Sequence, residues 1–95
     1  MEKFKEWDIA EILDTKEDIV SCLETAIEEN DMGFLLETLG ALSRSAGMTH
    51  IARELGVTRE GLYKSLSSDG RPSFETIIKL LDALGIRIKL EKKSA

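Results

Sequence analysis

The sequence predicts an all-α fold of five short helices, with an N-terminal arm before them and a short C-terminal β-strand after them. Three observations support this prediction. Apolar residues recur every three or four positions in five separate stretches between residues 16 and 84. Thr, Asp or Ser residues precede these stretches, and glycine or asparagine follows most of them, as at helix ends. Near the C-terminus the pattern changes to strict alternation, which is typical of a strand.

The N-terminal half of the chain predicts an arm and two amphipathic helices. Residues 1–14 carry apolar side chains without a clean period, which indicates an extended arm. Thr15 is the expected N-cap of a helix over residues 16–29. Asp31 is the expected cap of the next helix, which extends to about residue 45 along an apolar stripe of Met32, Leu35, Leu36, Leu39 and Leu42.

Two shorter helices follow, joined by a turn of three residues. Gly47 is expected to end the preceding helix, and Thr49 is expected to cap the first short helix. Gly56 stops this helix, because glycine readily adopts the positive φ that a sharp exit requires. Thr58 then caps the second short helix, which extends to about Ser67.

The C-terminal part predicts one more helix and a strand. Ser73 is the expected cap of the helix, Phe74 falls on its apolar face, and Gly85 closes it. Residues 86–91 alternate apolar and charged side chains and predict a half-exposed strand. The free edge of such a strand can pair with a second copy of the chain across a two-fold axis, or with residues 4–9 of its own chain.

The segment 49–67 has the sequence pattern of a helix-turn-helix. Ala52 is small at the position where the two helices cross, and Val57 can plug the angle between them. Leu62 and Leu66 of the second helix are expected to turn inward. The outer face of that second helix would then be free to enter the major groove of DNA.

The residues on this outer face suit contacts to DNA. Arg59 can make a bidentate contact to guanine, and Glu60 can accept from cytosine or orient Arg59. Polar residues at helix starts suit phosphate contacts. The same residues also fit an ordinary solvated surface of a helical domain that does not bind DNA. The predicted DNA-binding residues are Thr49, His50, Thr58, Arg59, Glu60, Tyr63, Lys64, Arg71 and Ser73.

Charge divides the chain into two unlike parts. Residues 1–40 have a net charge of −9, and residues 41–95 have a net charge of +4. A basic part suits phosphates and an acidic part suits a basic protein partner, although both also fit ordinary solvated surface. The sequence therefore predicts an acidic arm and helix over residues 1–30. It predicts a helix-turn-helix DNA-binding domain with the C-terminal strand over residues 31–95.

Composition argues against several classes of protein. A single Cys cannot form an internal disulfide or a four-thiolate zinc site, and one Cys and one His do not by themselves make a nucleophile with its base. No apolar run approaches the ~20 residues of a membrane span, and the acidic N-terminus does not have the pattern of a signal peptide. We therefore expect no catalytic activity, no cofactor, no metal, no membrane association and a cytoplasmic location.

The run IARELGVTREGLYKSLS at residues 51–67 resembles the core of a family of probable addiction-module antidote proteins. These are antitoxins with a lambda-repressor-like helix-turn-helix, close to the HigA-like group. Residues 70–76 and 80–85, the arm segment 4–8 and the pair Glu17-Asp18 are also similar to that family. Lambda-repressor-like proteins often carry Gln early in the first helix of the motif, where it grips a phosphate, and this chain has none there.

The resemblance implies an antitoxin of a type II toxin–antitoxin module. Such a protein neutralises a RelE/HigB-like toxin and represses its own operon as a homodimer on double-stranded operator DNA, whose half-sites we expect about one turn, roughly 34 Å, apart. A stand-alone regulator without a toxin, or a helical adaptor without DNA binding, is the alternative. The acidic arm would complement a basic toxin, or its aromatic residues would cover the core. The candidate toxin-binding residues are Phe4, Trp7, Asp8, Ile9, Glu11 and Ile12.

Overall fold

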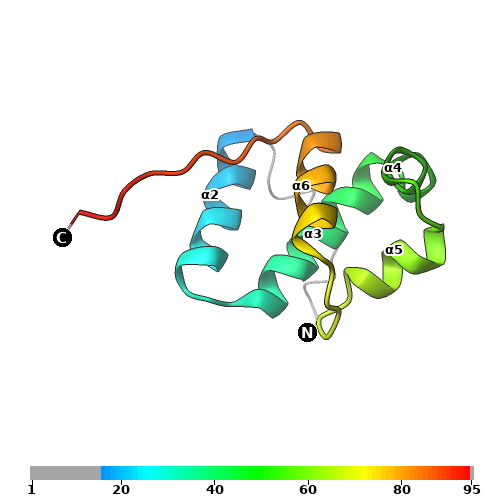
Figure 1. The fold of residues 1–95 in the computed structure, drawn as a ribbon, viewed down its shortest axis with the longest axis horizontal. Coiled ribbons are helices and arrows are strands. Elements are labelled where there is room, and N and C mark those ends of the chain that lie inside the picture. The colour runs from blue at the N-terminus through cyan, green and yellow to red at the C-terminus, as the bar shows by residue number, and fades with distance from the viewer. Residues whose placement is uncertain (1–15, 95) are drawn as a thin grey trace.

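The structure, a computed structural model, describes residues 16–94 of the chain. Within this range it contains five α-helices and no strand (Figure 1). The prediction of five helices is confirmed for the described part of the chain, with bounds close to those expected. The helices are α2 (Lys16–Glu28), α3 (Met32–Ala46), α4 (Met48–Leu55), α5 (Arg59–Ser65) and α6 (Phe74–Ala83).

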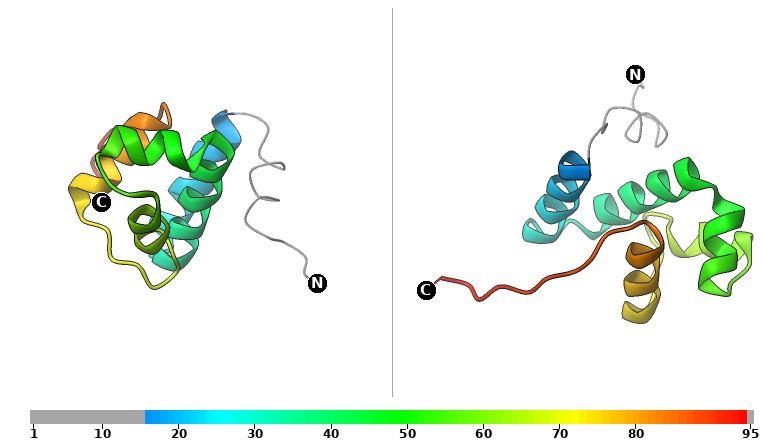
Figure 2. Two further views of the ribbon diagram at one scale, coloured as in Figure 1. Left: turned by 90° about the vertical axis from the view of Figure 1, so that its right-hand side faces the viewer. Right: turned by 90° about the horizontal axis from the view of Figure 1, so that it is seen from above.

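The helices share one core, in which α3 and α4 are central. Helix α2 packs on α3, and α4 contacts α3, α5 and α6. Leu39 of α3, Ile51 of α4, Leu62 of α5 and Leu80 of α6 have at most 1% of their surface exposed. Figures 1 and 2 show α4 and α5 at one end of the molecule, opposite α2 and the C-terminal tail.

Three helices end in the same way, with a residue in the left-handed region one or two positions after the last helical residue. These residues are Asn30, Gly56 and Gly85, with φ values of 59°, 75° and 81°. In each case the next amide donates to a carbonyl five residues earlier, at 2.8, 3.0 and 2.8 Å. This is the Schellman arrangement, which satisfies carbonyls that the helix leaves unpaired. Glycine, and less often asparagine, adopts the required φ at little cost.

Side-chain caps begin three of the helices as predicted. Asp31, Thr58 and Ser73 each accept a hydrogen bond from the amide three residues later, at 3.1, 2.9 and 3.1 Å. The expected cap at Thr49 is wrong, because α4 already begins at Met48, and Gly47 precedes it without a side-chain cap. Met48 is 4% exposed, so its burial in the core draws it into the helix and leaves Thr49 within the first turn. Thr15 lies outside the described residues.

Residues 86–91 alternate apolar and charged side chains as a strand does, but they do not form a strand in the structure. Ile86 donates its amide to the Leu81 carbonyl at 2.8 Å. Beyond it, residues 87–94 make no backbone hydrogen bond to any described residue. A strand requires a neighbouring strand edge, and the described segments of this chain are helices and their connections. The alternation is present, but the partner that would turn it into a sheet is absent from the described part of the chain.

Candidate nucleic-acid interface

The turn between α4 and α5 is fixed on both sides by hydrogen bonds. The amide of Gly56 donates to the Arg53 carbonyl at 3.2 Å, and the amide of Val57 donates to the Ala52 carbonyl at 3.0 Å. Thr58 then caps α5. Val57 does not plug the angle between the helices as expected, since 44% of its surface is exposed. The backbone bonds, and not an apolar plug, therefore hold the reversal from α4 to α5.

Helix α5 has a buried edge and a solvent face. Leu62 is 1% exposed, and Leu66, directly after the helix, is 5% exposed, so both point inward as predicted. The solvent face carries side chains that suit base and phosphate contacts, and all of them are exposed: Thr58, Arg59, Glu60, Tyr63 and Lys64. No described part of the chain buries this face.

Two residues on this face contact each other. The guanidinium carbon of Arg59 lies 5.7 Å from the centre of the Tyr63 ring, a cation–π contact between positions four apart on the helix. Of the two roles that the sequence left open for Glu60, orienting Arg59 is not seen: the contact of Arg59 is with the ring of Tyr63. The spacing of Arg59 and Tyr63 was the signal in the sequence that could have predicted the contact. The stack restricts the arginine before any ligand binds.

The two polar residues in the first turn of α4 were predicted to contact phosphates. Thr49 and His50 are both exposed. The Nε2 atom of His50 lies 3.7 Å from the Oε2 atom of Glu54 one turn later, with more than half of the His50 side chain exposed. A pair so exposed is worth little energetically. The His50 ring therefore remains accessible to a phosphate.

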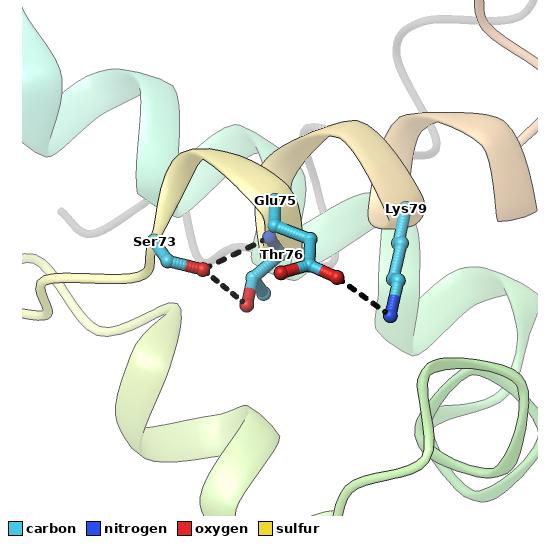
Figure 3. A network of polar contacts seen from close by, with 4 residues as sticks. All are labelled: Ser73, Glu75, Thr76 and Lys79. Carbon is cyan, nitrogen blue, oxygen red and sulfur yellow. Dashed lines mark hydrogen bonds and ion pairs between the residues drawn. The ribbon is translucent and has the colours of Figure 1, made fainter.

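The loop after α5 brings its polar residues to the start of α6. Arg71 is exposed, and its Nη1 atom donates to the Gly70 carbonyl at 3.2 Å. Ser73 caps α6: its Oγ atom accepts from the Thr76 amide and lies 3.0 Å from the Thr76 hydroxyl (Figure 3). The hydroxyls of Ser73 and Thr58 thus have structural roles in capping helices, and their predicted contacts to DNA would come in addition.

Phe74 lines the same groove as Ile77 and Leu81, as its predicted place on the apolar face requires, but the core does not cover it. It is the first residue of α6, and 74% of its surface is exposed. Beside it on the surface of α6, Lys79 forms an ion pair with Glu75 at 3.2 Å (Figure 3). The helical period predicts on which face of a helix a residue lies. It does not predict whether the core extends as far as the first turn, where a side chain on the apolar face can remain exposed.

The balance of charge around the motif is mild. Residues 48–73 contain four Lys or Arg and three Asp or Glu, a net charge of +1. No described group of three or more His, Cys, Asp or Glu side chains could hold a metal ion. No described helix is long and apolar enough to span a membrane. Attraction to phosphates would therefore depend on individual cations and not on a strong overall field.

Comparison with known proteins identifies the family. The sequence model of the family described as "Probable addiction module antidote protein" matches residues 3–92. The chain belongs to this antidote family. A relative of the antidote in Haemophilus influenzae, an uncharacterized protein, is 37% identical over 91 residues, which cover 96% of this chain and 94% of the relative. No solved structure matches the antidote. An antidote acts on a toxin, so membership of this family implies a toxin as partner.

The candidate toxin-binding residues of the antidote belong to the predicted N-terminal arm. All six of them fall before residue 16 and therefore outside the described residues. The described helix that follows the arm, α2, is packed on α3. The division of the chain at residue 30 stays a prediction.

Proposed function

We propose that this chain is the DNA-binding antitoxin of a type II toxin–antitoxin module. In this proposal α4 and α5 act as a lambda-repressor-like helix-turn-helix on operator DNA. The chain neutralises a RelE/HigB-like toxin and represses its own operon as a homodimer, by binding and without catalysis. The observation that carries the proposal is the exposed polar face of α5, held outward by the buried Leu62 and Leu66. The family favours this role over a stand-alone regulator.

The chemistry of the α5 face explains how it would read DNA. A guanidinium donates two hydrogen bonds to the O6 and N7 atoms of guanine in the major groove. The stack of Arg59 on Tyr63 limits the conformations of the arginine before binding, so less side-chain entropy is lost on contact. Glu60 would accept from the amino group of cytosine, and Lys64 would neutralise a phosphate.

Replacing Arg59 with alanine is expected to weaken specific binding by about 1–3 kcal/mol and to relax the choice of base at one position of each half-site. The reason is the loss of a bidentate contact to a base. Gel shifts on the operator, and on operators with single base changes, measure both effects. Lys79→Ala is the matched control, because it removes an exposed cation from α6 instead of α5. Unchanged affinity and base preference in Arg59→Ala would exclude Arg59 as a reader.

The N-terminal arm is the proposed toxin-binding segment. Its apolar residues would provide affinity, and its carboxylates would attract a basic toxin. Deletion of residues 1–14 is expected to abolish co-purification of the toxin after co-expression with the neighbouring gene. Operator binding by the same shortened protein should persist and would show that it is folded. If the toxin still co-purifies with a shortened protein that binds DNA, the toxin site lies elsewhere.

A further inference from the structure

The C-terminal tail, residues 86–94, carries an apolar row, Ile86, Ile88 and Leu90, whose exposure to solvent increases along the chain. Ile86 packs against the buried cluster of the core. Ile88 is 40% exposed, and Leu90 is 93% exposed. Figures 1 and 2 show the tail passing α2 and continuing away from the helices. The face that begins in the core therefore continues into solvent, where aliphatic side chains are unfavourable unless another surface covers them.

The backbone of the same segment also lacks partners in the described structure. Residues 87–94 make no backbone hydrogen bond to any described residue. An extended segment with alternating side chains and unpaired amides is a template for a second strand. The apolar row and the free edge together indicate that a further strand belongs beside the tail.

We infer that the strand which covers the tail is the tail of a second copy, paired antiparallel about a two-fold axis at Lys89. This inference rests on the homodimer of the proposed function and specifies its interface. Each tail would place Ile88 opposite Leu90 of the other copy, and the tails together would form a two-stranded ribbon between the two helical bodies. Because a C2 interface uses the same patch twice, each favourable pair occurs twice.

The register is predicted by comparing the cross-strand pairs of side chains that form when the two-fold axis passes through different residues of the tail. An axis at Lys89 pairs Ile88 with Leu90 on one face and Arg87 with Glu91 on the other, and leaves one like-charge pair, at Lys89 itself. An axis at Ile88 sets Arg87 against Lys89 twice, and an axis at Leu90 sets Arg87 against Lys93 twice. Cross-strand pairs of opposite charge stabilise a ribbon and pairs of like charge destabilise it, so the axis at Lys89 is favoured.

The surface near the base of the tail complements the same register. Ile86 and Ile88 line a groove of about 520 Å³ between α2, α3 and α6, and Glu24 of α2 lines it too. In the proposed register Lys92 of the second copy lies opposite Ile86. Its ammonium would thus lie on the side of the tail where the Glu24 carboxylate is found, and opposite charges would meet at both ends of the ribbon.

This interface determines where the two α5 helices lie in the dimer. The tail leaves the end of the molecule opposite to α4 and α5 (Figures 1 and 2). A dimer joined by its tails therefore has its two α5 helices at its far ends. We expect the half-sites to be separated by a whole number of helical turns, since only then do both helices face the DNA.

Cysteine cross-linking of the full chain tests the register. In a Cys22→Ser background, Lys89→Cys should form a disulfide-linked dimer under mild oxidation, because residues at the axis have Cα atoms about 5 Å apart. Glu91→Cys is the matched control: residue 91 lies opposite residue 87, so its own copy is about 13 Å away and beyond disulfide reach. Equal cross-linking of the two variants, or cross-linking of Glu91→Cys alone, would overturn the register.

Sedimentation measures whether the tail forms the dimer. The wild-type chain should be a dimer, and Leu90→Glu should raise the dissociation constant of the dimer by about a hundredfold through two lost apolar contacts. Ser94→Glu adds the same charge beyond the paired residues and should leave the constant unchanged. A monomeric wild type, or a dimer insensitive to Leu90→Glu, would overturn the inference. The apolar side chains of the tail would then be expected to contact the toxin or the N-terminal residues of the same chain.

Neither experiment contains DNA or toxin, so loss of operator binding would count against the proposed function alone.

Discussion

Replacing Gly70 with alanine is expected to destabilise the protein by about 3 kcal/mol and to weaken its binding to operator DNA. A Cβ atom at position 70 would collide with the carbonyl oxygen of Ser65 and would lie 2.8 Å from the carbonyl oxygen of Lys64. These are backbone atoms of the last turn of α5, so no flexible side chain can yield. Overpacking costs about 1–3 kcal/mol, and the upper end applies where the backbone must move. The loop that shifts carries Arg71 toward α6.

The conformation of Gly70 does not explain this expected cost, because its φ is not positive. The close approach of the loop to α5 alone forbids a side chain. Gly33→Ala is the matched control: its Cβ would have Asp31 Oδ1 at 3.9 Å as its nearest neighbour, and alanine in α3 should stabilise the helix by up to about 1 kcal/mol. Urea unfolding followed by circular dichroism measures both variants. A midpoint for Gly70→Ala equal to that of the wild type would show that the loop accommodates the methyl group.

Local chemistry made most of the helix boundaries predictable from the sequence. The caps at Asp31, Thr58 and Ser73 depend on residues three apart, and the ends at Gly56 and Gly85 depend on one residue with a positive φ. Such signals lie within a few positions of the chain, so a single sequence contains them.

Features that depend on distant parts of the fold were not predictable in this way. The contact of Gly70 with α5 depends on the path of a loop, which its turn-like composition does not specify. Burial of Met48, and not the capping ability of Thr49, determined where α4 begins. The tail alternates like a strand, but pairing requires a partner that its own described helices do not offer. The exposed face of α5 was predictable, because helical spacing placed Leu62 inward and its neighbours outward.

Two adjacent residues of α5 should separate folding from recognition. Leu62→Ala is expected to lower the free energy of unfolding by about 2–5 kcal/mol, because Leu62 is 1% exposed and its removal leaves a cavity. Tyr63→Ala should change that free energy by only about 1 kcal/mol, since Tyr63 is 39% exposed, lies outside the buried core cluster and stacks on Arg59. Denaturant unfolding of the two variants measures this difference.

Operator binding should respond to Tyr63→Ala although stability does not. Loss of the ring removes a contact to DNA and also frees Arg59, which must then be ordered on binding at a cost in entropy. Gel shifts at a temperature where both variants are folded should therefore show weaker specific binding by Tyr63→Ala. Leu62→Ala should lose affinity only in proportion to its unfolded fraction. If Tyr63→Ala binds the operator as tightly as the wild type, then the outer face of α5 does not read DNA, and the exposed polar residues there are solvated surface.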